Sequence, residues 1–490
     1  MSTTEKQDSR VLIPALAVTV MVVALLQTVV IPVLADIGKA LNASSSAVGW
    51  TVTANLLAAA VLTPILGRLG DVRGRRPVLL GILIVVAAGS LLAALTTSLP
   101  LLILARILQG ASFGLFPLAI GVLRDELPAQ RLTGAMAVVS GTLGIGGGIG
   151  LVLTGLLTRD GGDYHRIFWL SLAVTLVSLV LAAVTVPKHR PAGGGGIDWL
   201  GGGVLGAGLI LLLLPLSQGH EWGWASPATI GCLVASVIVF ALWIVLERRV
   251  DEPLVLPSLL ANRPFMITNA AGLLIGVAMF VSFLGVSGFV QTPSEVGYGF
   301  SASVLAASSV YLLPGALAGV VVAPIGGRLV HRFGGRSTLT LASLVGAVGF
   351  AFIAVLHTAS WQLILGVLFI NSAVSLGYAA MPALIVDEVR PDQTGVANSV
   401  NSIARSVGSS LASAVVITLL SSQLLPIGLP KESSYVIAFV IGAVGLTLSA
   451  VIVAVGLPRP GSRVDTRDSL EIEQERATSL AGEWSTVTGR

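Results

Sequence analysis

Charged and amide side chains that stand inside long apolar runs are the residues of this sequence best suited to chemistry. Arg106 and Arg405 each interrupt such a run, and Gln27, Asn55 and Gln109 do so as uncharged polar groups. If the runs span a bilayer, a lone cation there is costly and should face a cavity with a partner. Arg106 could instead extend to the outer surface and Arg405 to the cytoplasmic one. Each amide could line the same cavity or bond a neighbouring helix.

A second candidate group is the polar stretch 67–76, in which the acid Asp71 stands among four arginines. Gly67 and Gly74 allow the chain to turn tightly. The carboxylate could pair with guanidinium groups, or gain about 0.3–1 kcal/mol at the N-terminus of a facing helix. The alternative is a solvated loop whose basic residues only orient the protein.

The composition indicates that these residues belong to a membrane protein. Of 490 residues, 54% are hydrophobic and 11% are charged, against roughly a quarter charged in a soluble domain. This disfavours a cytosolic enzyme, a nucleic-acid binder and a secreted disulfide scaffold. The single cysteine, Cys232, excludes an internal disulfide and a cysteine-based metal cluster.

The apolar runs predict an all-α protein with fourteen transmembrane helices. A hydrocarbon core about 30 Å thick needs roughly 20 apolar residues in helical form. The predicted spans are 11–34, 46–66, 77–97, 99–123, 134–157, 166–187, 199–217, 226–246, 265–290, 302–325, 337–356, 360–385, 396–420 and 434–457.

Basic residues orient these spans with both termini in the cytoplasm. Of the 28 Lys and Arg residues, only Lys39, Arg159, Arg166 and Lys431 then fall outside the cell. Apart from Arg106 and Arg405, all the others lie in cytoplasmic segments, as the positive-inside rule requires.

Part of the sequence repeats. The glycines and arginines of 67–76 return in 327–336, 260 residues later, and Asp125-Glu126 with Gly134 returns as Asp387-Glu388 with Gly395. Such duplication is typical of transporters with a substrate site between two halves. We therefore predict a cytoplasmic N-terminus (1–10), an N-terminal six-helix bundle (11–187), a linker with two extra helices (188–264), a C-terminal six-helix bundle (265–457) and a disordered cytoplasmic tail (458–490).

Stretch 67–76 resembles the G-x-L-x-D-R-x-G-R-R loop of the major facilitator superfamily, with Val72 where the family usually has Arg. Fourteen spans with an extra pair in the middle resemble its drug–proton antiporter branch of antibiotic and multidrug efflux proteins. Arg106 with Gln109-Gly110 resembles the R-x-x-Q-G of the fourth helix. The resemblance implies a major facilitator fold of two pseudo-symmetric six-helix bundles plus two extra central helices.

The resemblance also implies roles for the first copy and the fifth helix. In the family the acid caps a facing helix, so the implied conformational latch is Gly67, Asp71, Gly74, Arg75 and Arg76. His331 replaces this acid in the second copy, which should latch weakly or not at all. The run with Gly146, Gly150 and Gly155 resembles the antiporter motif G-x-x-x-G-P-x-x-G-G, although Leu151 stands in place of the proline.

One departure concerns proton coupling. The branch usually carries an acid in the first helix, where this chain has Leu26, and no predicted span has a carboxylate in its middle. A coupled exporter needs a group that gains and loses a proton, usually a membrane carboxylate. Coupling would then use Asp36, Asp71 or the Asp125-Glu126 pair, and the cavity should prefer neutral or anionic substrates.

Together these features predict a secondary active efflux transporter for hydrophobic or anionic drugs, working by alternating access and proton antiport. It would be a monomer in a bacterial inner membrane that binds a small molecule and a proton but no nucleic acid, cofactor or metal. The alternatives are an uncoupled transporter, or one for lipids or anionic metabolites, and a membrane sensor that does not transport. No nucleotide loop, metal-ligand cluster or Ser/His/acid set points to an enzyme.

Overall fold

The computed structural model of the chain describes residues 9–43, 45–158, 163–188, 196, 198–250, 253–255, 257–389 and 393–458. Almost all of the predicted N-terminal segment and tail lie outside these residues, as does most of the glycine-rich part of the linker after Lys188. Every regular element in the described ranges is a helix.

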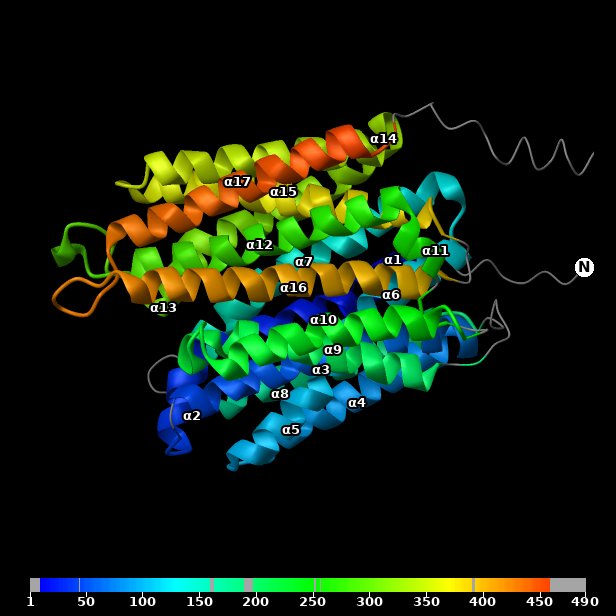
Figure 1. The fold of residues 1–490 in the computed structure, drawn as a ribbon, viewed down its shortest axis with the longest axis horizontal. Coiled ribbons are helices and arrows are strands. Elements are labelled where there is room, and N and C mark those ends of the chain that lie inside the picture. The colour runs from blue at the N-terminus through cyan, green and yellow to red at the C-terminus, as the bar shows by residue number, and fades with distance from the viewer. Residues whose placement is uncertain are drawn as a thin grey trace, which may run out of the picture.

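The long helices run roughly along the longest axis of the molecule (Figure 1). In the described residues, thirteen helices are long and apolar enough to cross a membrane. The long helices are α1 (Ser9–Thr28), α3 (Ser45–Arg73), α4 (Arg75–Leu95), α5 (Leu99–Gly110) with α6 (Leu115–Glu126), α7 (Ala129–Leu157), α8 (His165–Thr185), α9 (Trp199–Trp222), α10 (Pro227–Glu247), α12 (Arg263–Gln291), α14 (Leu313–Val355), α15 (Ser360–Val386), α16 (Thr394–Ser422) and α17 (Glu432–Gly456). The short elements are α2 (Leu34–Ala40), α11 (Pro257–Ala261), α13 (Val304–Ala306), η1 (Ile31–Val33), η2 (Ala111–Gly114), η4 (Ser294–Val296) and η5 (Ala307–Leu312).

The helices form two halves with separate apolar cores. One core joins residues of α12, α14, α15, α16 and α17 around Phe289, Phe350 and Phe439. Two others lie among α1 and α3 to α8. We call these groups the C half and the N half. The end at which α1 begins and α17 ends is called the terminal end, and the opposite one the far end (Figure 1).

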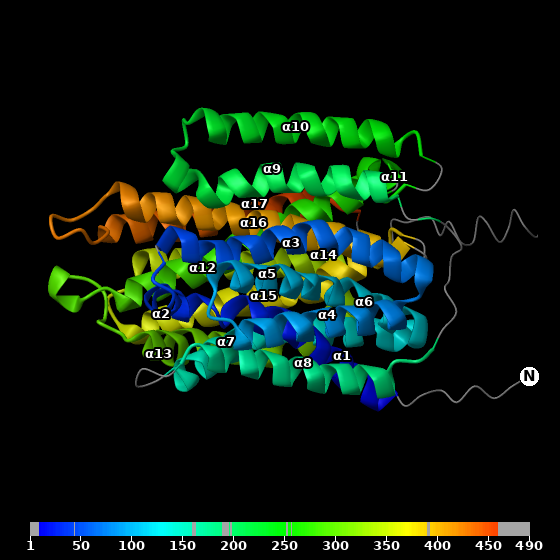
Figure 2. The same cartoon turned by 90° about the horizontal axis from the view of Figure 1, so that it is seen from below.

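Helices α9 and α10 form an accessory hairpin on the outside of the two halves. In Figure 2, α10 is outermost and α9 lies between it and the rest of the bundle. The side chain of Thr53 in α3 bonds Ser217 in α9 at 2.8 Å, and Trp224 donates to Thr418 of α16 at 2.9 Å. The hairpin region is therefore bonded to both halves.

The predicted first span, 11–34, is too long. Helix α1 ends at Thr28, and a 3₁₀ turn and α2 follow it. Pro32 lies in that turn. Since proline has no backbone N–H, it cannot continue the ladder of an α-helix through this position.

The prediction that residues 67–76 form a loop between two spans is also wrong. Helix α3 continues to Arg73 and α4 starts at Arg75, so only Gly74 separates them, with a φ of 96°. In the second copy, residues 307–355 form one helical stretch of 49 residues in which Gly334 alone leaves helical geometry, with a φ of 81°. Glycine tolerates this left-handed backbone without a Cβ clash, so the two helices can join through a single residue.

Candidate functional site

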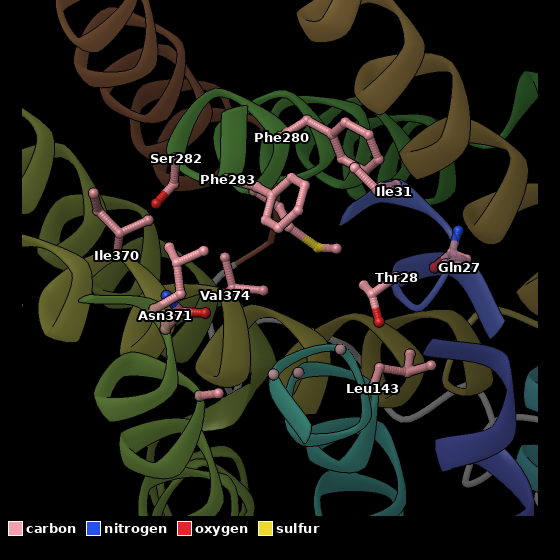
Figure 3. A pocket seen from close by; sticks show the side chains of 16 residues that line it. Gln27, Thr28, Ile31, Leu143, Phe280, Ser282, Phe283, Ile370, Asn371 and Val374 are labelled. Carbon is pink, nitrogen blue, oxygen red and sulfur yellow. The ribbon is translucent and has the colours of Figure 1, made fainter. Parts of the chain in front are cut away.

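A cavity lies between the two halves, in the part of the bundle nearer the far end. Its walls come from α1 with η1, α7, α12, α14 with the adjoining η5, and α15. The space between them, together with its opening to solvent, is about 780 Å³. Figure 3 shows Asn371 and Val374 on one side of the space and Gln27 and Thr28 on the other. Phe280 and Phe283 of α12 project into it, so the surface is mainly apolar and aromatic.

Two amides supply much of the polarity of this cavity. Asn371 donates its Nδ2–H to the carbonyl of Val367 at 3.1 Å. Gln27 makes no hydrogen bond with any residue that the structure describes, and it lines the cavity through its position at the end of α1. Because an amide both donates and accepts, Gln27 can bond either kind of polar group on a bound molecule.

A second, deeper cavity adjoins the first through Gln27, Leu143, Met279 and Phe280, which line both. Arg405 of α16 lies in its wall with Ser402, Ser406 and Ser409. Only about 8% of the Arg405 residue is exposed. Of the two positions that the sequence allows for Arg405, a cavity wall and the cytoplasmic surface, the side chain occupies the cavity wall.

The contacts of Arg405 are all neutral in the described residues. The guanidinium donates to Asn401 and, at 3.0 Å, to the hydroxyl of Ser402. Its Cζ lies 5.2 Å from the ring centre of Phe116 and 5.0 Å from that of Tyr378. A buried cation held by hydroxyl, amide and aromatic groups keeps its positive potential, so the deeper cavity favours an anionic group.

Arg106 has a different setting from Arg405. The residue is 1% exposed and donates to the carbonyls of Thr51 and Leu26, both at 3.1 Å, and to Gln109 at 2.6 Å. Asn55 in turn donates to the Arg106 carbonyl at 2.8 Å. Neither cavity described above includes these residues in its wall.

The Arg106 network connects helices of the N half. The Gln109 amide donates to Ser90 of α4 at 2.9 Å, so α1, α3, α4 and α5 are all tied together. Asn55 and Gln109 thus bond neighbouring helices, the alternative that the sequence left open for them. Leu26, where the resembled branch has an acid, is buried in the N-half core beside this network.

The predicted acid Asp36 lies away from the cavities. It is exposed in the first turn of α2, toward the far end. It is absent from the walls of both cavities.

Asp71 connects the two halves at the terminal end. Its carboxylate accepts hydrogen bonds from the backbone N–H groups of Gly395, at 3.0 Å, and Val396, at 3.2 Å, in the first turn of α16. Arg75 donates to the same carboxylate at 3.0 Å and pairs with Asp125. Because Asp71 is 4% exposed, this cap of the α16 N-terminus is shielded from water.

Arg124 of α6 makes a second connection between the halves. Its guanidinium donates to the hydroxyl of Thr394 and to the carbonyls of Val386, at 3.2 Å, and Val389, at 2.9 Å. From the sequence, Arg124 was expected only to help orient the protein in the membrane. Its single signal was its position just before the repeated acidic pair Asp125-Glu126.

The glycines of α7 face two neighbours. A Cβ on Gly146 or Gly150 would collide with Met21 or Thr28 of α1, so this pair allows α7 and α1 to pack closely. Gly155 instead faces Leu305, in the C half. Three further glycines of α7, at seven-residue spacing before Gly155, lie on its C-half side: Gly134, Gly141 and Gly148, opposite Gly327, Ala323 and Ala316.

Most of the aromatic and polar residues in the cavity walls were not predicted from the sequence. Asn371 is a polar residue inside a predicted span, a signal that could have marked it. Phe280, Phe283 and Tyr378 carry no such signal, because aromatic residues are as common in a helix core as in a binding site.

Comparisons with known proteins agree with this architecture. The family model of the Major Facilitator Superfamily matches residues 16–413. The chain is 31% identical over 417 residues to the tetracenomycin C resistance and export protein of Streptomyces glaucescens, covering 84% of this chain and 75% of that protein. It is 28% identical to a multidrug resistance protein B homolog of Mycobacterium tuberculosis (79% of this chain, 71% of that one) and to a probable actinorhodin transporter of Streptomyces coelicolor (77% and 67%).

A solved structure shows the same fold. The crystal structure of the human organic anion transporter MFSD10 superposes with a TM-score of 0.62 at 16% identity, covering 91% of this chain and 99% of that one. Thus two helical halves, a cavity between them and a family match over most of the sequence agree. The chain belongs to the Major Facilitator Superfamily, whose members are multi-pass membrane transporters.

Proposed function

We propose that this protein is a secondary active exporter that carries hydrophobic or anionic aromatic compounds across a bacterial inner membrane by alternating access. The observation that carries the proposal is Arg405, a buried cation without a carboxylate partner in the described residues, set in an aromatic cavity between the halves. Two similar proteins are named for tetracenomycin C export and for actinorhodin transport, and a third for multidrug resistance.

Alternating access requires contacts that form and break between the halves. We assign the terminal end to the cytoplasm, because the basic residues gather there, and we count α14 as two crossings on either side of Gly334, which gives fourteen. Asp71, with Gly67, Gly74, Arg75 and Arg76 around it, then forms a cytoplasmic latch. In this arrangement the latch is closed and the cavity lies on the outer side of it.

We also propose proton antiport by a monomer. No carboxylate lines either cavity, so the proton would be carried by a group outside them, such as Asp71, the Asp125-Glu126 pair or Asp36. Gln27 and Arg405 would bind substrate. Arg106, Asn55 and Gln109 would keep the N half rigid while the halves move, with Gly146, Gly150 and Gly155 allowing close contact with α1 and the C half.

The test is dye accumulation in an efflux-deficient bacterium, with fluorescein as an anionic aromatic probe and ethidium as a cationic one. We expect the protein to lower fluorescein accumulation more than ethidium accumulation, and a protonophore to abolish the effect. Arg405→Gln should remove the preference for fluorescein, whereas Arg405→Lys, which keeps the charge, should retain part of it. Export of both dyes that is unaffected by Arg405→Gln would contradict the assigned substrate class.

A second candidate is an uncoupled transporter, or one for lipids or anionic metabolites, which the lack of a carboxylate in both cavity walls favours. Fluorescein export that persists after the proton gradient collapses would support it over antiport. A membrane sensor that does not transport is a third reading. It would bind the anionic probe in detergent yet leave accumulation unchanged.

A further inference from the structure

Several buried polar atoms gather at the terminal end of the accessory hairpin, far along the chain from the latch and the cavities. Here α9 begins, directly after Asp198, and α10 ends, at Glu247. Figure 2 shows these ends of α9 and α10 next to α11, on the side of the molecule that carries the N-terminus. Residues 253–255 lead from α10 toward α11, and Leu254 and Val255 are buried.

Each of the two acids uses one carboxylate oxygen and leaves the other without a partner. Asp198 caps α9 by accepting the N–H of Gly201 at 2.7 Å through Oδ1, and Glu247 accepts the N–H of Val255 at 3.3 Å through Oε2. The second oxygens, Asp198 Oδ2 and Glu247 Oε1, are buried and have no hydrogen-bond partner among the described residues.

The two unpartnered oxygens lie close to the same glycine. A Cβ built on Gly201 would lie closer than 3.0 Å to both Asp198 Oδ2 and Glu247 Oε1. Both atoms therefore crowd the same bare side of this glycine. Glu247 is only 1% exposed, so water does not separate the pair on its side.

An independent buried donor points to the same place. Trp243 stands one helical turn before Glu247, on the same face of α10, and is 6% exposed. Its indole Nε1–H is directed at the Glu247 carboxylate, at a geometry short of a full hydrogen bond. An indole N–H beside two unpartnered carboxylate oxygens makes this a buried polar site.

No cation balances the two acids in the described residues. Arg248 and Arg249 follow Glu247 but are exposed, and Arg68 comes from α3, which packs on α9. None of the three forms an ion pair with either acid. The only charged residue of α16, the other helix packed on α9, is Arg405, which lies in the deeper cavity.

A proton fits this site better than a metal ion does. A hard cation such as Ca²⁺ takes 6–8 oxygen ligands, whereas this site offers two free oxygens and an N–H donor. No group of three or more potential metal ligands occurs in the described ranges. Glu247 also stands at the C-terminus of α10, where the helix dipole disfavours a negative charge.

We propose that Asp198 and Glu247 share one proton and form a proton-binding site at the base of the accessory hairpin. The proton lies between Asp198 Oδ2 and Glu247 Oε1, so one carboxyl donates to the other and both unpartnered oxygens are satisfied. Two buried carboxylates this close together cannot both ionise without a large penalty, and they titrate as a pair.

The site has a mechanical consequence for the segment that enters the C half. Glu247 holds the backbone of Val255, and Leu254 and Val255 pack in one cluster with Ala60 of α3 and Val396 of α16. Loss of the shared proton would leave two anions face to face and loosen this segment where it touches both halves. The inference is independent of substrate and of transport.

Infrared spectroscopy of the full-length protein in lipid nanodiscs tests the proposal without a transport assay. A protonated carboxyl group has a C=O stretch that shifts in D₂O and disappears on ionisation. We expect such a band at neutral pH, equal to one carboxyl per chain, that both Glu247→Gln and Asp198→Asn remove. Because one proton is shared, the double variant should remove no more intensity than either single variant. Asp163→Asn, at an exposed acid of the far end, is the control and should leave the band intact.

Two results would overturn the shared proton. One is a band that survives Glu247→Gln, and the other is a pair of separate bands whose losses add in the double variant. If the variants fail to fold, the spectrum of the wild type still tests the proposal. A wild-type protein without any protonated carboxyl band at neutral pH would contradict the shared proton. Gly201→Ala keeps both acids but places a methyl group between their oxygens, and it should lower the intensity of the band.

Discussion

The two copies of the repeat, 67–76 and 327–336, occupy corresponding places at the terminal end of the N half and the C half. Both turn between their helices at one glycine of positive φ, Gly74 at 96° and Gly334 at 81°. Both also end in an arginine that donates to a carbonyl near the end of the last helix of its own half. Arg76 reaches Ala183 of α8, and Arg336 reaches Ala454 of α17.

The copies differ in what they contribute to the other half. Asp71 and Arg75 of the first copy form a buried network with Asp125 and the N-terminus of α16. At the corresponding positions the second copy has His331, which is exposed, and Gly335, which packs against Leu384 of its own half. Duplication has thus preserved the turn and the anchor within each half, whereas the charged connection between halves exists in one copy.

Helix starts explain part of this difference. The N-terminus of α16 begins at Thr394, so Gly395 and Val396 have N–H groups without a partner inside the helix. The corresponding Gly134 lies well inside α7, which begins at Ala129, and its N–H is already used within the helix. Only one of the two facing helices therefore offers a site for a carboxylate.

Asp71→Asn should have the largest effect among changes to the repeat. It removes charge-assisted hydrogen bonds worth about 1.5–3 kcal/mol, so the balance between closed and open states should shift roughly 10- to 100-fold. We expect transport of fluorescein in proteoliposomes to fall by at least that lower factor, with insertion unchanged. The control is His331→Asn in the second copy, for which we expect almost normal transport. Equal losses in both variants would contradict the asymmetry.

A methyl group at Gly67 should be the next most harmful change. Its Cβ would collide with Ser399 and lie 2.9 Å from the carbonyl oxygen of Gly395, so α3 and α16 must separate. We expect Gly67→Ala to reduce transport severalfold and to destabilise the protein by about 1–3 kcal/mol. The Cβ of Gly327→Ala comes no closer than 3.0 Å to its nearest neighbours in α7, Ala137 and Gly134, and this variant should cost less. Thermal unfolding in detergent and fluorescein flux would show whether this order holds.

Arg76→Ala and Arg336→Ala should have small and similar effects. Each removes a hydrogen bond from a guanidinium to a carbonyl of α8 or α17, worth about 1 kcal/mol net. We expect both variants to lower the unfolding temperature by only about 1 °C. A marked loss in one variant alone would show that the two anchors are not equivalent.

His331→Asp should have the smallest effect, although it restores the acid to the second copy. The carboxylate would find no free N–H at Gly134, since α7 has begun before that residue. Transport rate and thermal stability should therefore stay close to those of the wild type. A clear gain in stability would mean that α7 can be capped after all.

Much of the fold could be predicted from the sequence because twenty-residue apolar runs and clustered charges are strong signals in a bilayer. The ends of the helices were less predictable. Residues 68–73 include three charged side chains, yet they are helical, because Asp71 finds its partners in α4 and α16 instead of water. Hydropathy cannot foresee such contacts. Pro32, by contrast, was a visible signal that the first span is shorter than its apolar run.

The candidate site was predictable only where a charge or amide interrupts an apolar run. On this basis Arg405 and Gln27 were correctly predicted to line a cavity. The same reasoning also predicted a cavity position for Arg106, whose partners include backbone carbonyls of its own half. The Asp198–Glu247 pair escaped it, because both acids stand at helix ends and come together only when α9 folds on α10.

The distance between the halves at the terminal end tests the central claim most directly. Spin labels on Arg73→Cys in the N half and Arg332→Cys in the C half, both exposed, can be measured by double electron–electron resonance after Cys232→Ser. We predict one dominant short distance in this background and a shift toward a longer one when Asp71→Asn is added, with no shift for His331→Asn. Identical distributions in all three proteins would contradict the account that Asp71 holds the two halves together.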